Sequence, residues 1–303
     1  MTSSEPASPH PARVALLADL FETEGAIYMA SRRDPSDCRV GLFGVPYDGT
    51  TSFRPGTRFG PAAIREVSSG LESYDPQLDL DLEELAFVDL GAVAISFGAP
   101  EPVVAAVKAA TQAVLELGLK PLMLGGEHSI SSGAVAAVAE RYPELALVQL
   151  DAHADLRHEW LGNQHSHACA MRRCLEVLPS GALLQIAIRS GTRQEFEELR
   201  HTGRLVAIER MAESLAALRG RPLYLTVDLD WFDPSVLAGT GTPEPGGFLW
   251  KEFAALVEEL RHHNLVGADV VELAPQLDPS GVSSVLAAKV VRSLLLLLGA
   301  TAP

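Results

Sequence analysis

The sequence has few cysteines, and this scarcity narrows the class of protein. Its three cysteines, Cys38, Cys169 and Cys174, are too few for the disulfide framework of a small secreted protein. The first residues also lack the apolar segment of a secretory signal. We therefore expect a cytoplasmic protein with reduced thiols.

Clusters of basic residues are also missing from the sequence. The chain carries 24 Lys and Arg against 39 Asp and Glu, a net charge of -15. Nucleic-acid binding needs clustered positive charge, so no nucleic-acid partner is expected, and the acidic balance suits a cationic ligand. The leucine run at 294–298 follows Lys289 and Arg292 and is too short to span a bilayer, which predicts a buried C-terminal helix and no membrane partner.

The 303 residues have an ordinary globular composition, 47% hydrophobic and 21% charged, and alternate between strand and helix patterns. No linker divides them, so we predict a single domain over 1–303, with a disordered tail at 1–12 and an amphipathic helix at 13–31. Strands rich in Val, Ile and Leu, separated by helices, indicate an α/β fold with a mostly parallel sheet covered on both faces. The predicted strands are 38–45, 85–89, 121–124, 145–150, 183–188, 204–208, 223–228 and 266–273. The predicted helices are 101–119, 129–141, 168–178, 210–219, 250–262 and 282–298, and another begins at Pro61.

Residues 46–60, rich in Gly, Thr and Pro, form a long connection after the first strand. Loops of this length in compact domains are usually functional. A plain surface connection fits the same composition. Both interpretations stay open from the sequence.

Three predicted strands run directly into polar residues. They continue into Gly125-Gly-Glu-His-Ser129, Asp151-Ala-His-Ala-Asp155 and Asp228-Leu-Asp-Trp-Phe-Asp-Pro234. Ligands bind at the carboxyl ends of the strands in such sheets, and side chains two apart in an extended segment face the same side. Six side chains are therefore expected at one edge of the sheet: His128, Asp151, His153, Asp155, Asp228 and Asp230.

Four carboxylates and two imidazoles at one edge predict a two-metal site. Carboxylates held close together repel strongly at the low effective dielectric of a cleft, and two divalent cations would cancel their charge. Ligands without cysteine favour a hard or borderline ion such as Mn²⁺, and paired ions can hold a bridging hydroxide as nucleophile. Each motif is weak alone, because a single Asp is commonly a cap and paired glycines mark turns. The three together carry the prediction.

These motifs, with Ser166-His-Ala168 and Glu272, resemble those of the ureohydrolases, the arginase and agmatinase family. Two further stretches, 44–50 continuing to Arg65 and 239–247, are similar to the agmatinase branch of that family. The resemblance runs from about Gly41 to the C-terminal helix. It implies one ureohydrolase domain with a three-layer α/β/α fold, an eight-stranded mostly parallel sheet, and a homo-oligomer of three or six chains.

The resemblance also implies the chemistry of the site, with two Mn²⁺ ions on the six side chains above. A metal-bridging hydroxide would attack the guanidinium carbon while Glu272 binds the guanidinium N–H groups. His167 would pass a proton to the leaving amine. His165, two residues earlier, is an alternative, but a histidine followed by a small residue at a helix start matches His167 better.

Departures from the arginase pattern indicate agmatine, cleaved to putrescine and urea, as the substrate. Ser190 follows Arg189 where arginases carry an aspartate for the α-amino group, and residues 157–164 lack their Ser/Asn-rich pattern. A guanidino acid such as 4-guanidinobutyrate is an alternative, because Arg157 or Arg54 could bind a carboxylate tail.

Two alternatives come from other classes. A non-catalytic ureohydrolase-like subunit would be expected to lack metal ligands or Glu272, and none is missing from the sequence. A two-metal phosphoesterase would be expected to carry a phosphate-binding Gly-rich loop with a lysine, and the sequence contains none.

Overall fold

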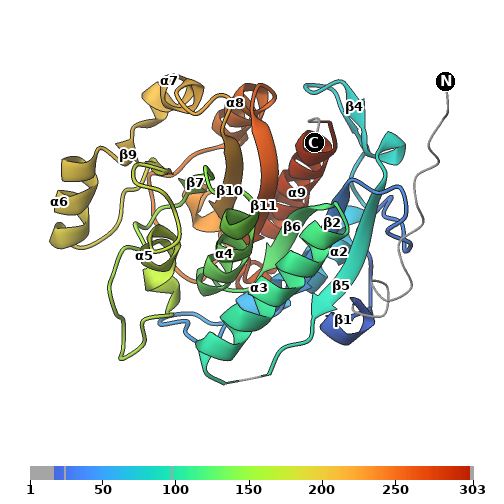
Figure 1. Ribbon diagram of the computed structural model, residues 1–303, viewed down its shortest axis with the longest axis horizontal. Helices are drawn as coiled ribbons and strands as arrows, with labels where there is room; N and C mark the ends of the chain where they lie inside the picture. The colour runs from blue at the N-terminus through green and yellow to red at the C-terminus, as the bar shows by residue number, and fades with distance from the viewer. Residues whose placement is uncertain (1–16, 24, 97, 301–303) are drawn as a thin grey trace.

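A computed structural model describes residues 17–23, 25–96 and 98–300 of the chain (Figure 1). The strands of its main sheet are β1 (Phe21–Glu22), β2 (Val40–Val45), β5 (Phe87–Val93), β6 (Lys120–Gly125), β7 (Ala146–Leu150), β8 (Leu183–Ile186), β9 (Leu205–Val206), β10 (Pro222–Asp228) and β11 (Asn264–Val271). Among the described residues their order is β1-β5-β2-β6-β11-β10-β7-β8-β9. A separate hairpin pairs β3 (Tyr74–Asp75) with β4 (Leu80–Asp81).

The strands of the main sheet are parallel except at one edge. All neighbouring pairs from β5 to β9 run parallel, and β1 pairs antiparallel with β5. Strands β2, β6 and β7 are buried along their whole length, as expected for a sheet with helices on both faces. The eight parallel strands confirm the predicted eight-stranded sheet, and β1 adds a short antiparallel edge.

Helices cover both faces of the sheet. They are α2 (Gly60–Ser68), α3 (Pro100–Glu116), α4 (Ser131–Arg141), α5 (Ala170–Leu175), α6 (Arg193–Thr202), α7 (Met211–Ala216), α8 (Trp250–Leu260) and α9 (Val282–Ala300). One apolar cluster packs α2, α8 and α9 against the sheet, and a second packs α3, α4 and α5 against it. Figure 1 shows α3 and α4 side by side in front of the sheet. These layers confirm the predicted three-layer α/β/α fold.

The predicted helix at 13–31 is wrong over most of its described part. The tail 1–12 and residues 13–16 and 24 lie outside the described residues, and residues 17–20 are helical. The chain then forms β1, in which Phe21 lies opposite Val93 of β5. The buried ring of Phe21 packs against the ring of Phe43, with 5.7 Å between the ring centroids. Strand pairing and this packing outweigh the amphipathic pattern.

Helix α6 was not predicted, because its charged residues hide the apolar stripe. Its start carries a sequence signal nonetheless. Thr192 accepts a hydrogen bond from the backbone N–H of Glu195 (3.2 Å), and the Glu195 carboxylate accepts one from the backbone N–H of Thr192 (2.7 Å). A Thr followed three residues later by Glu is the signature of this capping box.

Helix α9 is a core element. By length and composition it could cross a membrane, so the expectation that its apolar stretch is too short was wrong. Its leucines 294–298 are nevertheless buried within the apolar cluster of the sheet. Arg292 is also buried, and its Nη2 pairs with Asp75 Oδ2 at 2.8 Å. This burial confirms the predicted C-terminal core helix.

The order of the central strands determines where the polar strand ends meet. Strands β6, β11, β10 and β7 are consecutive and parallel, so their carboxyl ends share one edge of the sheet. Segments that follow residues 125, 150, 228 and 271 are therefore brought together, although they lie far apart in the sequence. Ligands bind at this edge in open parallel sheets.

Candidate metal centre

The six predicted ligands lie at, or just after, the carboxyl ends of β6, β7 and β10. His128 begins a 3₁₀ helix (His128–Ile130) that leads into α4. Asp228 is the last residue of β10, and Asp230 lies in the 3₁₀ helix Leu229–Trp231 that follows. The other three ligands come directly after β7. All six side chains therefore start from three strands in the middle of the sheet.

The backbone beyond β7 and β10 differs from the predicted extended segments. Residues 151–155 lie outside the strands, and Asp155 has a left-handed backbone with φ 51°. After β10, Asp228 Oδ1 accepts a hydrogen bond from the backbone N–H of Asp230 (2.9 Å), which closes a tight turn. Turns, rather than strand alternation, bring these carboxylates together. Ala154 packs into the core and also lies in the lining of the cleft over the site, so it does not simply face away from it.

The glycines before His128 allow close packing. A Cβ on Gly126 would lie 2.1 Å from the backbone oxygen of Tyr47, and one on Gly125 would lie 2.5 Å from Val271 Cγ1. Only glycine permits this approach. The pair therefore brings the loop after β2 and the end of β11 against the segment that carries His128.

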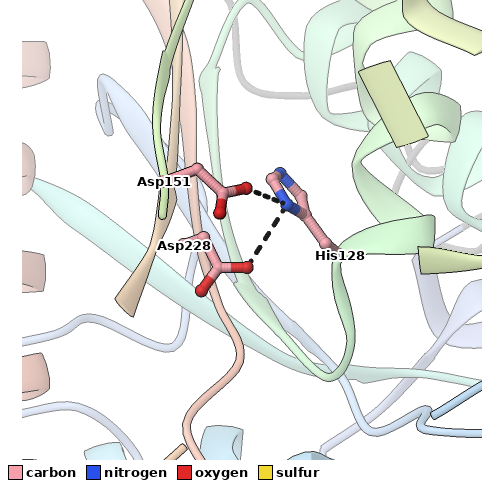
Figure 2. A group of neighbouring side chains, drawn as sticks. All are labelled: His128, Asp151 and Asp228. Atoms are coloured by element: carbon pink, nitrogen blue, oxygen red, sulfur yellow. Dashed lines mark ion pairs between the residues drawn. The ribbon is translucent and has the colours of Figure 1, made fainter. Parts of the chain in front are cut away.

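Figure 2 shows the ring of His128 facing Asp151 and Asp228. Its Nδ1 lies 3.0 Å from Asp151 Oδ2, 3.0 Å from Asp155 Oδ2 and 3.4 Å from Asp228 Oδ2. Among the described residues, this buried nitrogen has no partner in hydrogen-bond geometry. A nitrogen surrounded by carboxylate oxygens in this way is arranged as a ligand of a cation.

A second group of ligand atoms adjoins the first. His153 Nδ1 lies 2.9 Å from Asp230 Oδ2 and 3.6 Å from Asp151 Oδ1. Within each group, the ligand atoms lie within 4.8 Å of one another. Asp151 belongs to both groups and turns one oxygen toward each histidine, so it is suited to bridge two ions. The groups are His128, Asp151 and Asp228, and Asp151, His153 and Asp230.

Burial and mutual repulsion raise the pKa of two of the carboxylates, whereas at Asp151 burial is outweighed by the neighbouring rings of His128 and His153, which lower the pKa. Burial and the neighbouring Asp151 raise the pKa of Asp155 to about 6. Burial and the neighbouring Asp230 raise the pKa of Asp228 well above its ordinary value. The protein alone would therefore retain protons on the cluster. Divalent cations would replace those protons, so the donor set fits a binuclear metal centre.

The ring of His128 is held in the tautomer that a metal ligand needs. Its Nε2 lies 2.9 Å from Thr226 Oγ1, and that hydroxyl donates to Asp269 Oδ1 (2.6 Å). A hydroxyl has one proton, so Thr226 can only accept a hydrogen bond from Nε2–H. With Nε2 engaged in this way, Nδ1 is the ring nitrogen left to bind an ion, and it faces the carboxylates.

A pair of buried glutamines supports the shared ligand. Gln149 of β7 donates from Nε2 to Asp151 Oδ2 (2.6 Å). Gln185 of β8 donates from Nε2 to Gln149 Oε1 (2.6 Å) and to the backbone oxygen of Ala154 (2.8 Å). Both glutamines are fully buried. These hydrogen bonds fix the orientation of the Asp151 carboxylate.

Glu272 follows β11 with a left-handed backbone, φ 69°, which is rare outside glycine. The predicted strand 266–273 therefore ends earlier, at Val271. The backbone N–H of Glu272 donates to Gly126 (2.9 Å), and Oε1 accepts from the backbone N–H of His128 (2.8 Å). Burial, and then Glu127, raise the pKa of Glu272 well above its ordinary value. This strained turn places the carboxylate in the cleft beside the ligands.

The two candidate proton-transfer histidines lie in different places. His167 begins a 3₁₀ helix (His167–Cys169) ahead of α5 and lines the cleft. His165 is not among the described residues that line the cleft. Its backbone N–H donates to Asn163 Oδ1 (2.6 Å) in a turn. Burial lowers the pKa of His167 to about 4, so its ring is neutral near pH 7. This geometry favours His167 over His165.

A cleft of about 290 Å³ opens over the centre. Its lining includes Arg157 and Trp160, with the Arg157 guanidinium carbon 4.0 Å above the Trp160 ring. Arg54 donates instead to the backbone oxygens of Thr240 (2.6 Å) and Gly241 (3.1 Å), so it anchors the loop at 239–247. Of the two arginines considered for a substrate tail, Arg157 is the one at the cleft.

Several residues around the centre were not predicted from the sequence. Gln149, Thr226 and Asp269 lie inside strands, each between two apolar residues. A polar residue inside a buried strand must find a hydrogen-bond partner, and this was the signal available. Within 46–60, Ser52 lines the cleft, which favours the functional interpretation of that loop.

Comparisons with known proteins agree with this geometry. A profile of the arginase family matches residues 38–297, which span β2 to β11 and include all six predicted ligands. The agmatinase of Bacillus subtilis (strain 168) is 40% identical over 278 residues, 90% of this chain and 96% of that protein. The solved agmatine ureohydrolase of Thermoplasma volcanium is 32% identical, with a TM-score of 0.80 over 93% of this chain and 97% of that chain. Proclavaminate amidino hydrolase from Streptomyces clavuligerus is 31% identical, with a TM-score of 0.83 over 91% and 98%.

Replacing the shared ligand should remove more metal than replacing an unshared one. We expect Asp151→Asn, which alters both groups, to retain much less than about one Mn²⁺ per chain, and His153→Asn to retain about one. Elemental analysis after gel filtration in metal-free buffer measures this. The exposed His158 provides a matched control, because His158→Asn should retain the wild-type content. Equal metal contents in Asp151→Asn and His153→Asn would contradict the shared role.

The metal-free protein should become less stable as the pH rises from about 4 to about 6. The pKa of Asp155 is raised from 3.8 to about 6 on folding, so the folded state binds a proton that the unfolded chain releases. The stability from that proton is complete below about pH 4 and is lost as the pH approaches about 6. Urea unfolding at several pH values, with Asp155→Asn as reference, isolates this contribution. If the free energy of unfolding of wild type instead rose relative to that of Asp155→Asn over this pH range, the prediction would be wrong.

Proposed function

This chain belongs to the arginase family, and we propose that it hydrolyses agmatine to putrescine and urea. Family membership and the 40% identity to an agmatinase support an amidinohydrolase enzyme. The observation that carries the proposal is the pair of ligand groups joined at Asp151, with Glu272 in the same cleft. Such an arrangement suits hydrolysis of a small cationic guanidino compound.

The ions that we assign to this centre are two Mn²⁺. Carboxylate and imidazole donors without cysteine support that choice. When bound, the ions supply a water activated for attack on the guanidinium carbon. His128 would hold its ion through Nδ1, because Nε2 is engaged by Thr226. The residues assigned to the ions are His128, Asp151, His153, Asp155, Asp228 and Asp230.

Glu272 binds the guanidinium group in this proposal. A carboxylate can accept paired N–H donors from a guanidinium, and their attraction is stronger in a buried site than in water. The hydrogen bond from the His128 backbone fixes one oxygen of Glu272 and so orients the carboxylate. A bound cation would also offset the burial that raises the pKa of Glu272.

His167 transfers the proton in this proposal. Because burial keeps its ring neutral, it can take the proton released by the attacking water. It then returns that proton to the leaving amine as the carbon–nitrogen bond breaks. The position of His167 in the cleft lining, which His165 does not share among the described residues, supports the assignment.

Two charged side chains near the site are candidates for binding the tail of the substrate. Glu244 is 38% exposed, with Oε1 2.8 Å from Ser190 Oγ and 3.8 Å from His153 Nε2, and it could attract a terminal amine. Arg157 favours a second candidate function, hydrolysis of a guanidino acid such as 4-guanidinobutyrate. We place agmatine first because Arg157 is already engaged with Trp160 and because similar relatives are agmatinases.

We also propose that the chain is a single-domain, cytoplasmic homo-oligomer of three or six copies. The three cysteines form free thiols, which supports a reducing compartment. The homo-oligomer and its number of copies stay a prediction from the family resemblance.

Urea release from agmatine, arginine and 4-guanidinobutyrate, with Mn²⁺ titrated, tests the substrate. We expect kcat/KM for agmatine to exceed the other values by about 10²-fold or more, because a misplaced carboxylate or amine leaves charged groups unpaired. Arg157→Gln should leave agmatine turnover within about threefold of wild type. No urea from agmatine would refute the proposal. A preference for 4-guanidinobutyrate that Arg157→Gln abolishes would establish the second candidate.

Exchange of each candidate histidine tests the proton-transfer residue. His167→Ala should lower kcat for agmatine by about 10²-fold or more, because the leaving amine then lacks its proton donor. His165→Ala is the matched control and should keep nearly full turnover. Both are measured as urea release at saturating agmatine and Mn²⁺. Near-normal turnover of His167→Ala would remove His167 from the mechanism.

A further inference from the structure

Glu127 is a buried carboxylate next to His128 in the sequence, and its main hydrogen-bond partner lies in the loop 46–60. Its carboxylate accepts the backbone N–H (2.7 Å) and the hydroxyl (2.5 Å) of Thr50, and the hydroxyl of Ser129 (2.5 Å). Glu127 is 0% exposed, so these donors replace its solvent. It therefore anchors the loop 46–60 at Thr50.

Thr50 passes this constraint to His167. Its Oγ1 accepts a hydrogen bond from the backbone N–H of His167 (3.0 Å) and lies 3.3 Å from Nδ1 of the ring. The single hydroxyl proton of Thr50 is already donated to Glu127 Oε1. Thr50 can therefore only accept a hydrogen bond from the ring, which requires the proton to be on Nδ1.

The other nitrogen of the His167 ring is directed to the cleft. Its Nε2 lies 3.3 Å from Ser52 Oγ, and both residues line the cleft. Ser166 Oγ lies 3.4 Å from Nδ1, nearly the same distance as Thr50 Oγ1, and its rotatable hydroxyl can accept the same Nδ1–H. A neutral imidazole with a proton on Nδ1 carries its lone pair on Nε2. Nε2 is then the atom that can take and return a proton beside the substrate.

We propose that Glu127, acting through Thr50, is a positioning residue that holds His167 with Nδ1 protonated and Nε2 open to the cleft. This inference rests on the proposed function, since it assigns the proton-transfer atom of the same reaction. The molecule uses the same arrangement for His128, where Asp269 takes the hydroxyl proton of Thr226 and Thr226 fixes the ring.

Substitutions at Thr50 test the arrangement kinetically. Thr50→Val removes the hydroxyl at nearly constant shape and should lower kcat for agmatine about 10- to 100-fold, with KM nearly unchanged, because the ring loses its orientation but not its place. Thr50→Ser keeps the hydroxyl and should restore kcat. Thr51→Val is the matched control, because Thr51 Oγ1 approaches the same carboxylate at 3.4 Å but makes no described contact with His167.

The tautomer itself provides a readout that needs no turnover. Side-chain ¹⁵N–¹H correlation spectra of the full-length protein, loaded with diamagnetic Mg²⁺, distinguish protonated from unprotonated ring nitrogens. The signals of His167 are assigned by their loss in His167→Ala. Wild type and Thr50→Ser should have Nδ1 protonated and Nε2 unprotonated. Thr50→Val and Glu127→Gln should populate both tautomers, at the metal content of the wild type.

The two readouts separate this inference from the proposed function. A wild-type ring in the expected tautomer that Thr50→Val disturbs, in a protein that releases no urea from agmatine, would support the positioning role and refute the substrate. A wild-type spectrum with Nε2 protonated would overturn the inference even if every variant failed to fold. Normal kcat and an unchanged tautomer in Thr50→Val would also overturn it, whatever the substrate.

Discussion

Repulsion among carboxylates buried at one edge of the sheet is the constraint on which the rest of this structure depends. Asp151, Asp155 and Asp228 crowd one ring nitrogen of His128, and burial with this crowding raises the pKa of Asp155 and Asp228. Such a cluster is stable only with protons or cations. Metal binding at this site would therefore be coupled to folding, because bound cations would offset the repulsion that the apolar packing on both faces of the sheet otherwise opposes.

The parallel sheet makes that crowding possible. Four consecutive strands, β6, β11, β10 and β7, deliver their carboxyl ends to one edge, and the turns beyond them do the fine placement. Asp155 and Glu272 both adopt left-handed backbone conformations there. Strain of this kind persists where the surroundings overdetermine it, here through the hydrogen bonds of Glu272 to Gly126 and His128. The rigid layers thus maintain a conformation that the local sequence disfavours.

Features encoded by neighbouring residues could be predicted, and features that depend on distant partners could not. The apolar strands and the Asp-x-His-x-Asp segment after β7 are local patterns, so the fold and the convergence of six side chains followed from the sequence. Strand β1 depends on pairing with β5, more than 60 residues away in the sequence. The local amphipathic pattern therefore led to the wrong prediction of a helix at 13–31. Glu127 gave no local indication of its partner, because Thr50 lies 77 residues earlier. The turns at Asp155 and Asp230 likewise depend on tertiary contacts that an alternation rule ignores.

The threonine between carboxylate and imidazole has a physical consequence of its own. A carboxylate in direct contact with a histidine would stabilise the imidazolium and raise the pKa of the ring. With Thr50 between them, Glu127 fixes which nitrogen of His167 carries the proton while the hydroxyl keeps the carboxyl group one residue away from the ring. Burial then dominates and lowers the pKa of His167 to about 4. The ring can therefore be oriented by a buried carboxyl group without direct contact and still remain neutral, as a group that must first take a proton and then release it requires.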